Sequence, residues 1–272
     1  MENIFRRLDF VIKKADEVTE HFHKNELDEV TMFCMCILDR LNFASQSLKI
    51  LVFNFYKKTK VDYGSGIILR AVLLDYLIVL NALDIYGKNL KDPQTCYKEL
   101  KNFTLMMLCD SVRNTLDYFE TLENRLPQEV LSNMYKNLVK MNPSCFEEYS
   151  FDGSKPIIKM TNFRSPKQMF NVLLTSRELQ SYKSIYDAYL FYSKYDHFGN
   201  MFYGLSRIKP ADQLANIDKA VTAFPKSLMF IIVILNSLYP KDELIQNKLY
   251  ETMSFIDEIE NLAPHSSKRT SE

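Results

Sequence analysis

Glycine, proline and cysteine are scarce in this chain, tryptophan is absent, and neither sign of charge is in excess. The 272 residues include six glycines, nine prolines and five cysteines. So few turn-forming residues disfavour a protein built from many short strands and turns. The 34 basic residues are balanced by 34 acidic ones, whereas proteins that hold duplex nucleic acid usually carry a basic excess. These absences argue against β-rich folds and against duplex-binding proteins.

The cysteines lack the spacing of a metal site or of a disulfide framework. Their number is odd and no CxxC pair occurs. Cys34 and Cys36 are two residues apart, so on a helix their side chains would diverge. The sequence therefore predicts reduced thiols, most of them buried, as in a cytoplasmic protein.

Membrane-directed segments are also missing. The N-terminus is amphipathic and charged throughout, unlike a signal peptide. The apolar run at 228–238 is too short to span a bilayer. Residues 66–83 are nearly long enough, but Arg70 and Asp75 within them would make insertion costly. We therefore expect a soluble, cytoplasmic protein with no membrane partner.

Helical periodicity is what the chain has in abundance. Apolar residues recur at helical spacing almost throughout, and the alternation typical of strands is rare. The sequence predicts an all-α fold, a single domain over residues 1–262 with about seven to nine helices around a central apolar helix at 65–86. We expect 142–166 to be an irregular loop that could cover a pocket, and 263–272 to be a disordered tail. No heptad register is sustained long enough to predict a coiled coil.

Motifs of common enzymes are absent from the sequence. It contains no phosphate-binding GxxxxGK[ST] loop, no GxGxxG, no HExxH and no GxSxG. His21 and His23 would point to different helix faces and have no nearby carboxylate or cysteine to complete a metal site. We therefore predict no metal and no cofactor.

The segment 186–200, YDAYLFYSKYDHFGN, combines tyrosines with a serine, an aspartate and a histidine. Tyr189, Ser193 and His197 share one helix face at i, i+4 and i+8, and Tyr192 and Asp196 form a second i, i+4 pair. Such a surface could bind a ligand. In the alternative interpretation the histidine simply ends its helix against the dipole, and the serine donates to the backbone one turn back.

Arg70 and Asp75 pose a related question, because both lie in the apolar helix predicted at 65–86. Five residues separate them by about 140° around a helix, so they do not pair with each other. A buried charge without a partner is very costly, so each should contact a polar side chain of another helix. We expect Arg70 to meet Asp196 or a tyrosine hydroxyl, and Asp75 to accept from the serine or histidine of the later segment. This arrangement would be either a structural network or a site.

The two motifs together resemble an all-helical bacterial family, number 5677 among the domains of unknown function. The resemblance rests on an arginine and an acid on one apolar helix and a tyrosine, a serine and a histidine on a later one: Arg70, Asp75, Tyr189, Ser193 and His197. Aspartate replaces the glutamate of the family's first motif, which shortens its reach. In organisation the resemblance covers about residues 60–200, and it implies a helical bacterial protein.

More distantly, the arrangement is similar to HEPN domains, helical bundles that include ribonucleases of antiphage and toxin systems. Their signature is an arginine followed four to six residues later by a histidine on one helix. Phe191 or Tyr192 stands where that arginine would fall. This motif therefore gives no reason to expect the ribonuclease activity of HEPN domains in this chain.

Two functions remain open. The first is a non-enzymatic interaction or sensing module with a protein partner, in a bacterial defence or mobile-element setting that the resemblance alone implies. The alternative is a metal-independent, HEPN-like ribonuclease or nucleotide hydrolase, the only case in which RNA or a nucleotide would be the partner. Its catalytic residues would be His197 as general acid or base, Asp75 as its orienting group and Arg70 against phosphate charge. The candidate binding residues are Arg70, Tyr189, Tyr192, Ser193, Asp196 and His197. The oligomeric state does not follow from the sequence.

Overall fold

The protein is all-α. We describe a computed structural model in which residues 1–23, 27–55, 62–147, 155–159, 163–194 and 209–261 are placed. Within these residues the regular structure is helical, apart from an isolated antiparallel bridge between Phe146 and Ile158. The helices are α1 (Glu2–Phe22), α2 (Glu29–Phe55), α3 (Asp62–Lys88), α4 (Pro93–Glu120), α5 (Gln128–Met141), α6 (Pro166–Thr175), α7 (Ser184–Ser193), α9 (Pro210–Val221), α10 (Ala223–Leu238) and α11 (Glu243–Asn261).

Helix starts follow the local signals in the sequence. At α4 the side chain of Asp92 accepts a hydrogen bond from the backbone N–H of Thr95, and Pro93 occupies the first turn. A short 3₁₀ turn (Gln180–Tyr182) precedes α7.

The contacts within the chain divide it into two compact units. The first joins Met1–Asp84 to Met169–Glu272, and the second is Ile85–Gln168. The expectation of a single domain over 1–262 stays a prediction, and the two units are described separately below.

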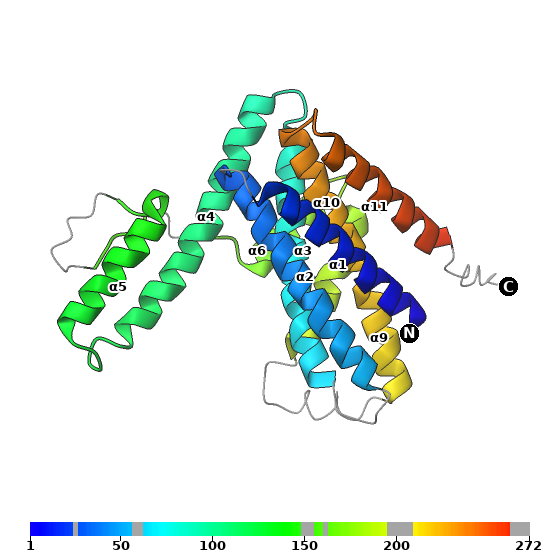
Figure 1. Ribbon diagram of the computed structural model, residues 1–272, viewed down its shortest axis with the longest axis horizontal. Coiled ribbons are helices and arrows are strands. Elements are labelled where there is room, and N and C mark those ends of the chain that lie inside the picture. The colour runs from blue at the N-terminus through cyan, green and yellow to red at the C-terminus, as the bar shows by residue number, and fades with distance from the viewer. Residues whose placement is uncertain (24–26, 56–61, 148–154, 160–162, 195–208, 262–272) are drawn as a thin grey trace. The chain divides into compact units, whose positions relative to one another are not determined.

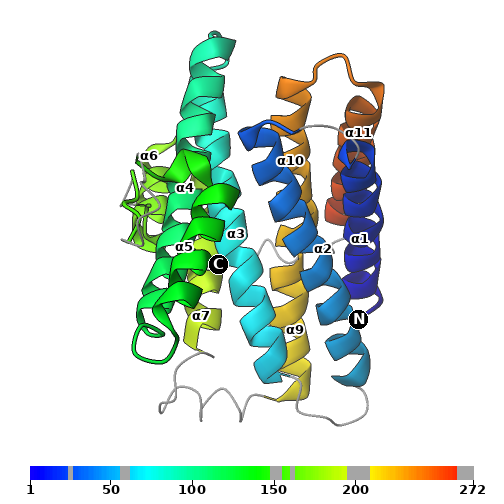
Figure 2. The same ribbon diagram turned by 60° about the vertical axis from the view of Figure 1, so that its left-hand side comes forward.

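In the first unit, α1 packs against α2, and α10 packs against α1, α2 and α11 (Figure 1). Helices α9 and α10 follow one another as one nearly continuous helix interrupted at Thr222 (Figure 2). Nearly every residue of α3 from Val72 to Ala82 is buried. The Tyr76 ring packs against the rings of Tyr182 and Phe230, 6.3 and 6.0 Å away between centroids. The central apolar helix is therefore present as the sequence predicts.

The second unit has its own apolar core between α4, α5 and the chain that follows them. Part of the predicted loop 142–166 belongs to this core, because Cys145 and Phe146 are buried in it. The backbone N–H of Glu147 donates to the carbonyl of Ile157, and the N–H of Lys159 donates to that of Cys145. The first residues of the segment are thus more ordered than the sequence suggests. Two stretches of it, 148–154 and 160–162, lie outside the described residues.

Two helices of the described chain are long and apolar enough to cross a membrane. They are Gly64–Lys88 and Pro210–Leu238, the latter spanning α9 and α10. Of their most apolar windows, 67% and 61% of the residues are buried inside the protein. Core helices of soluble proteins have this property. The burial therefore supports the expected soluble protein, and a cytoplasmic location stays a prediction.

Candidate functional site

Asp75 of α3 contacts another helix, as its sequence context requires, but through an unexpected partner. The side chain is buried, and its carboxylate accepts two hydrogen bonds from Arg40 of α2. Arg40 Nε lies 2.9 Å from Oδ2 and Nη2 lies 3.0 Å from Oδ1. The planar guanidinium matches the two carboxylate oxygens in this geometry. Asp75 therefore pairs with α2, whereas the sequence predicted a donor from Ser193 or His197. Because His197 lies outside the described residues, its contact with Asp75 stays a prediction.

The two members of this pair have different surroundings. The Asp75 side chain is 9% exposed, whereas that of Arg40 is 58% exposed. Burial raises the pKa of Asp75, and the hydrogen bond and charge of Arg40 lower it by less, so the pKa lies above its ordinary value. The pair thus places a buried acid under a cation that remains in contact with water. It holds α3 to α2.

Arg70 is half-buried on α3, and it is not without a partner in the chain. Asp196, expected beside Arg70, and His197, expected beside Asp75, lie outside the described residues. Their roles, and the predicted contact of Arg70 with Asp196, stay predictions.

The described residues of the 186–200 segment mostly pack against their neighbours. Tyr189 and Tyr192 of α7 are buried. The ring of Tyr186 stacks on that of Phe170 from α6, with 4.2 Å between centroids. Ser193 does not donate to Asp75, because its hydroxyl donates to the carbonyl of Leu190, 2.8 Å away. For the serine this is the structural interpretation offered by the sequence.

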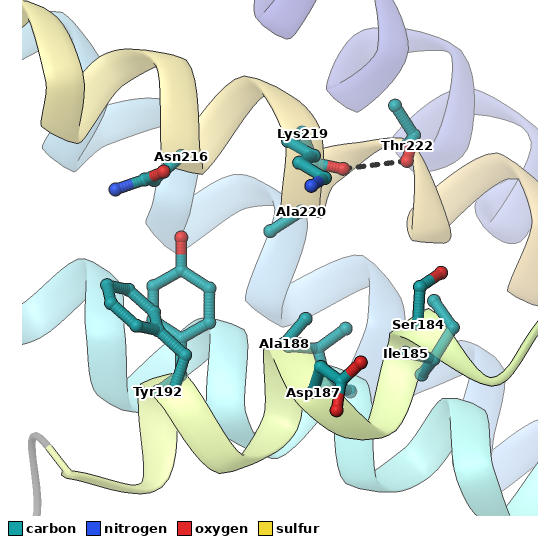
Figure 3. Close-up of a pocket in the computed structure, with 11 residues that line it drawn as sticks. Ser184, Ile185, Asp187, Ala188, Tyr192, Asn216, Lys219, Ala220 and Thr222 are labelled. Atoms are coloured by element: carbon teal, nitrogen blue, oxygen red, sulfur yellow. Dashed lines mark hydrogen bonds between the residues drawn. The ribbon is translucent and has the colours of Figure 1, made fainter.

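A pocket of about 320 Å³ lies between α7 and the α9–α10 helix (Figure 3). Among the predicted binding residues, Tyr192 lines it, and its hydroxyl points from α7 toward α9. Asp187 and Lys219 bring opposite charges from the two facing helices. The volume is at the small end of the range for ligand pockets. The remaining lining residues are Leu73, Ser184, Ile185, Ala188, Phe191, Asn216, Ala220 and Thr222.

A second pocket, of about 580 Å³, lies beside α1 and the start of α2 and includes His23 and Cys36. Its acidic residues are Glu20 and Asp39. Across the placed residues, however, no three histidine, cysteine or acidic side chains come together in a group that could hold a metal ion.

A further surface lies on α2, where sequence reasoning did not look. Four large apolar side chains on its outer face are half to two-thirds exposed: Met32 (50%), Phe43 (66%), Ile50 (62%) and Phe53 (59%). Together with three further exposed residues they are spaced alternately four and three residues apart, which places them on one line along the helix. We call this line the α2 stripe: Met32, Cys36, Asp39, Phe43, Gln46, Ile50 and Phe53. It is about 32 Å long at the rise of an α-helix.

The opposite face of α2 is fully occupied by the core. Leu38, Leu48 and Val52 have no exposed surface, and Phe33 and Leu41 have little. Because large apolar side chains occur on both faces, the sequence of α2 lacks the uniformly polar outer face that would mark its orientation. The stripe could therefore be recognised only from the packing.

Searches of protein-family models, of curated proteins and of solved structures found no match to the chain. The resemblance to the bacterial helical family and to HEPN domains therefore stays a prediction.

Proposed function

We propose that the protein is a non-enzymatic interaction module and that the α2 stripe is its protein-binding face. The observation that carries this proposal is the exposure of four large apolar side chains along one helix. Burying a side chain of this kind stabilises a protein by about 1.5–3 kcal/mol compared with leaving it in water. Contiguous apolar patches on soluble proteins commonly mark interaction sites. A partner that covers the stripe would recover the part of that free energy that corresponds to the surface still exposed, about half to two-thirds of each side chain.

The geometry around Asp75 favours this function over the hydrolase. In the hydrolase, Asp75 would orient the imidazole of His197. Both of its carboxylate oxygens already accept hydrogen bonds from Arg40. The pair is consistent with a role in docking two helices, which ion pairs commonly have without catalysis.

The biological setting of the module rests on the family resemblance. We propose a bacterial defence or mobile-element system, in the cytoplasm. The five cysteines support that compartment, since none forms a disulfide and four of them are buried.

Site-specific photo-crosslinking tests the proposal in the cells that express the full chain. A photoreactive phenylalanine analogue replaces Phe43 in the stripe or, as the matched control, Tyr250 on α11, which is 75% exposed. We expect a covalent protein adduct from the first position and none from the second, with mass spectrometry identifying the attached protein. An absence of adducts from Phe43, and likewise from Ile50, would contradict the proposed function.

A further inference from the structure

We propose that the α2 stripe binds the α2 stripe of a second copy of this chain, with the two helices antiparallel about a two-fold axis near Phe43. This inference rests on the proposed function, in which the stripe binds a protein, and adds the identity of that protein. It follows from the order of residues along the stripe, from the position of its charge and from its area.

The stripe reads almost the same from either end. From Met32 to Phe53 its positions are apolar, apolar, polar, apolar, polar, apolar and apolar, with Phe43 at the centre. A two-fold axis places residue i of one copy against residue j of the other and j against i. With the axis at Phe43, Met32 faces Phe53 and Cys36 faces Ile50. Each apolar side chain therefore meets an apolar one.

The two polar positions of the stripe decide between the two directions of pairing. In the antiparallel arrangement, the Asp39 carboxylate of one copy faces the Gln46 amide of the other. Gln46 donates one amide hydrogen to Asn42 within its own helix, and its second amide hydrogen is available to a carboxylate. In a parallel arrangement, Asp39 would face Asp39 in the middle of an apolar interface. Two like charges there would repel at a cost that the antiparallel pairing avoids.

The ends of α2 add to this preference. Antiparallel helices align their dipoles favourably, because the positive start of each helix lies near the negative end of the other. A parallel pair would bring like ends together.

The area of the stripe predicts a reversible dimer rather than a permanent one. At their exposed fractions, the four large apolar side chains present about 450 Å² per copy, taking a full aromatic side chain as about 200 Å². Pairing would bury about twice that area before flanking residues are counted, which lies at the low end for specific interfaces. We therefore expect dimers at about 50 µM protein that dissociate on dilution.

Cysteine chemistry tests the direction of pairing. Cys36 is exposed in the stripe, while the other cysteines are buried. In the antiparallel pair the two native Cys36 side chains lie about 21 Å apart along the helix, beyond disulfide reach. Ile50→Cys should instead place a thiol opposite Cys36 of the second copy. Under mild oxidation we expect disulfide-linked dimers from Ile50→Cys, and none from wild type or from Ile50→Cys combined with Cys36→Ser. A disulfide dimer of the wild type through Cys36 would overturn the antiparallel arrangement.

Sedimentation velocity tests the dimer itself on the purified full chain. At about 50 µM we expect wild type to dimerise, and Phe43→Glu to weaken association at least tenfold because it buries a charge at the axis. Tyr250→Glu, the same change on α11, should leave association unchanged, and circular dichroism confirms that each variant folds. A monomeric wild type at this concentration overturns the dimer. If Phe43 then crosslinks to a different protein in cells, the proposed function stands and this inference alone fails. If no adduct forms either, both fail.

Discussion

Helices α2 and α11 are both partly exposed on the first unit, yet their outer faces differ. The exposed residues of α11 are mostly polar, with Tyr250 and Met253 as its large exposed apolar side chains. Its inner side packs Phe255 on Phe10, with 3.8 Å between ring centroids. The outer face of α2 carries four large apolar side chains among its polar ones. Water as a neighbour favours a polar outer face, so the contrast supports the proposed protein-binding face on α2.

The polar contacts that hold the two helices differ as well. Lys14 of α1 pairs with Glu251 of α11 at 2.5 Å, and Lys248 of α11 pairs with Glu17 of α1 at 2.6 Å. These four charges alternate across the α1–α11 contact. Arg40 of α2 forms a bidentate pair with Asp75 of α3 and covers this buried acid. One arrangement neutralises charges at the edge of the core, and the other protects a charge within it.

The largest expected effect separates the two faces of α2. Leu48→Ala removes a side chain with no exposed surface, and we expect it to lower the free energy of unfolding by about 2–5 kcal/mol because a cavity remains. Ile50→Ala, two residues away and 62% exposed, should change it by less than about 0.5 kcal/mol in the dilute protein. Urea denaturation at low protein concentration measures both. A large loss for Ile50→Ala would mean that the stripe is covered within the single chain.

A smaller effect is expected from the pair that joins α2 to α3. Arg40→Ala leaves the Asp75 carboxylate buried without its cation, and we expect a loss of about 1–3 kcal/mol. This is less than for a fully buried pair because Arg40 is largely exposed. Lys49→Ala is the matched control, because Lys49 pairs with Asp9 at 2.5 Å and both side chains are about half exposed. Equal urea midpoints for the two variants would show that Asp75 does not depend on Arg40.

The smallest expected effect concerns pH and the α1–α11 contact. Burial raises the pKa of Glu17, but hydrogen bonds and charge from Lys248 and Lys14 together lower it by more than burial raises it. The pKa therefore lies below its ordinary value of 4.5. The hydrogen bond from Lys14 likewise lowers the pKa of Glu251. A lowered pKa means that the folded state favours the ionised form. The contribution of these carboxylates to the stability of the folded state is therefore present above about pH 4.5 and is lost as the pH falls through the folded pKa. Glu17→Gln should therefore cost less than about 1 kcal/mol at pH 7, and the cost should fade in acid, as thermal melts across pH would show.

The contribution of Asp75 to stability should change with pH in the opposite direction. Its pKa is raised, chiefly by burial, so its contribution is fully present below its ordinary value of 3.8 and is lost as the pH rises through the folded pKa. The stability of Asp75→Asn relative to wild type should accordingly improve from pH 3 to pH 7, while that of Glu17→Gln declines. The same slope for both variants would contradict the assignment of opposite environments.

Most of the helices could be predicted from the sequence, because their signals are local. The start of α6, Pro166–Thr175, is an example, because a proline in the first turn marks it in the sequence. The central position of α3 followed from its apolar composition on all sides. For Asp75, burial and the need for a partner on another helix also followed, since both depend on the cost of a lone buried charge.

The identity of that partner was decided by the tertiary structure alone. Arg40 lies on a different helix, 35 residues earlier, and several segments of the sequence offer a charge or hydroxyl that could have served. The orientation of α2 was decided in the same way. Its sequence carries large apolar side chains on both faces, so local periodicity does not tell which side enters the core. The packing of α1 and α10 against α2 chose one face to bury and left the other, the α2 stripe, exposed.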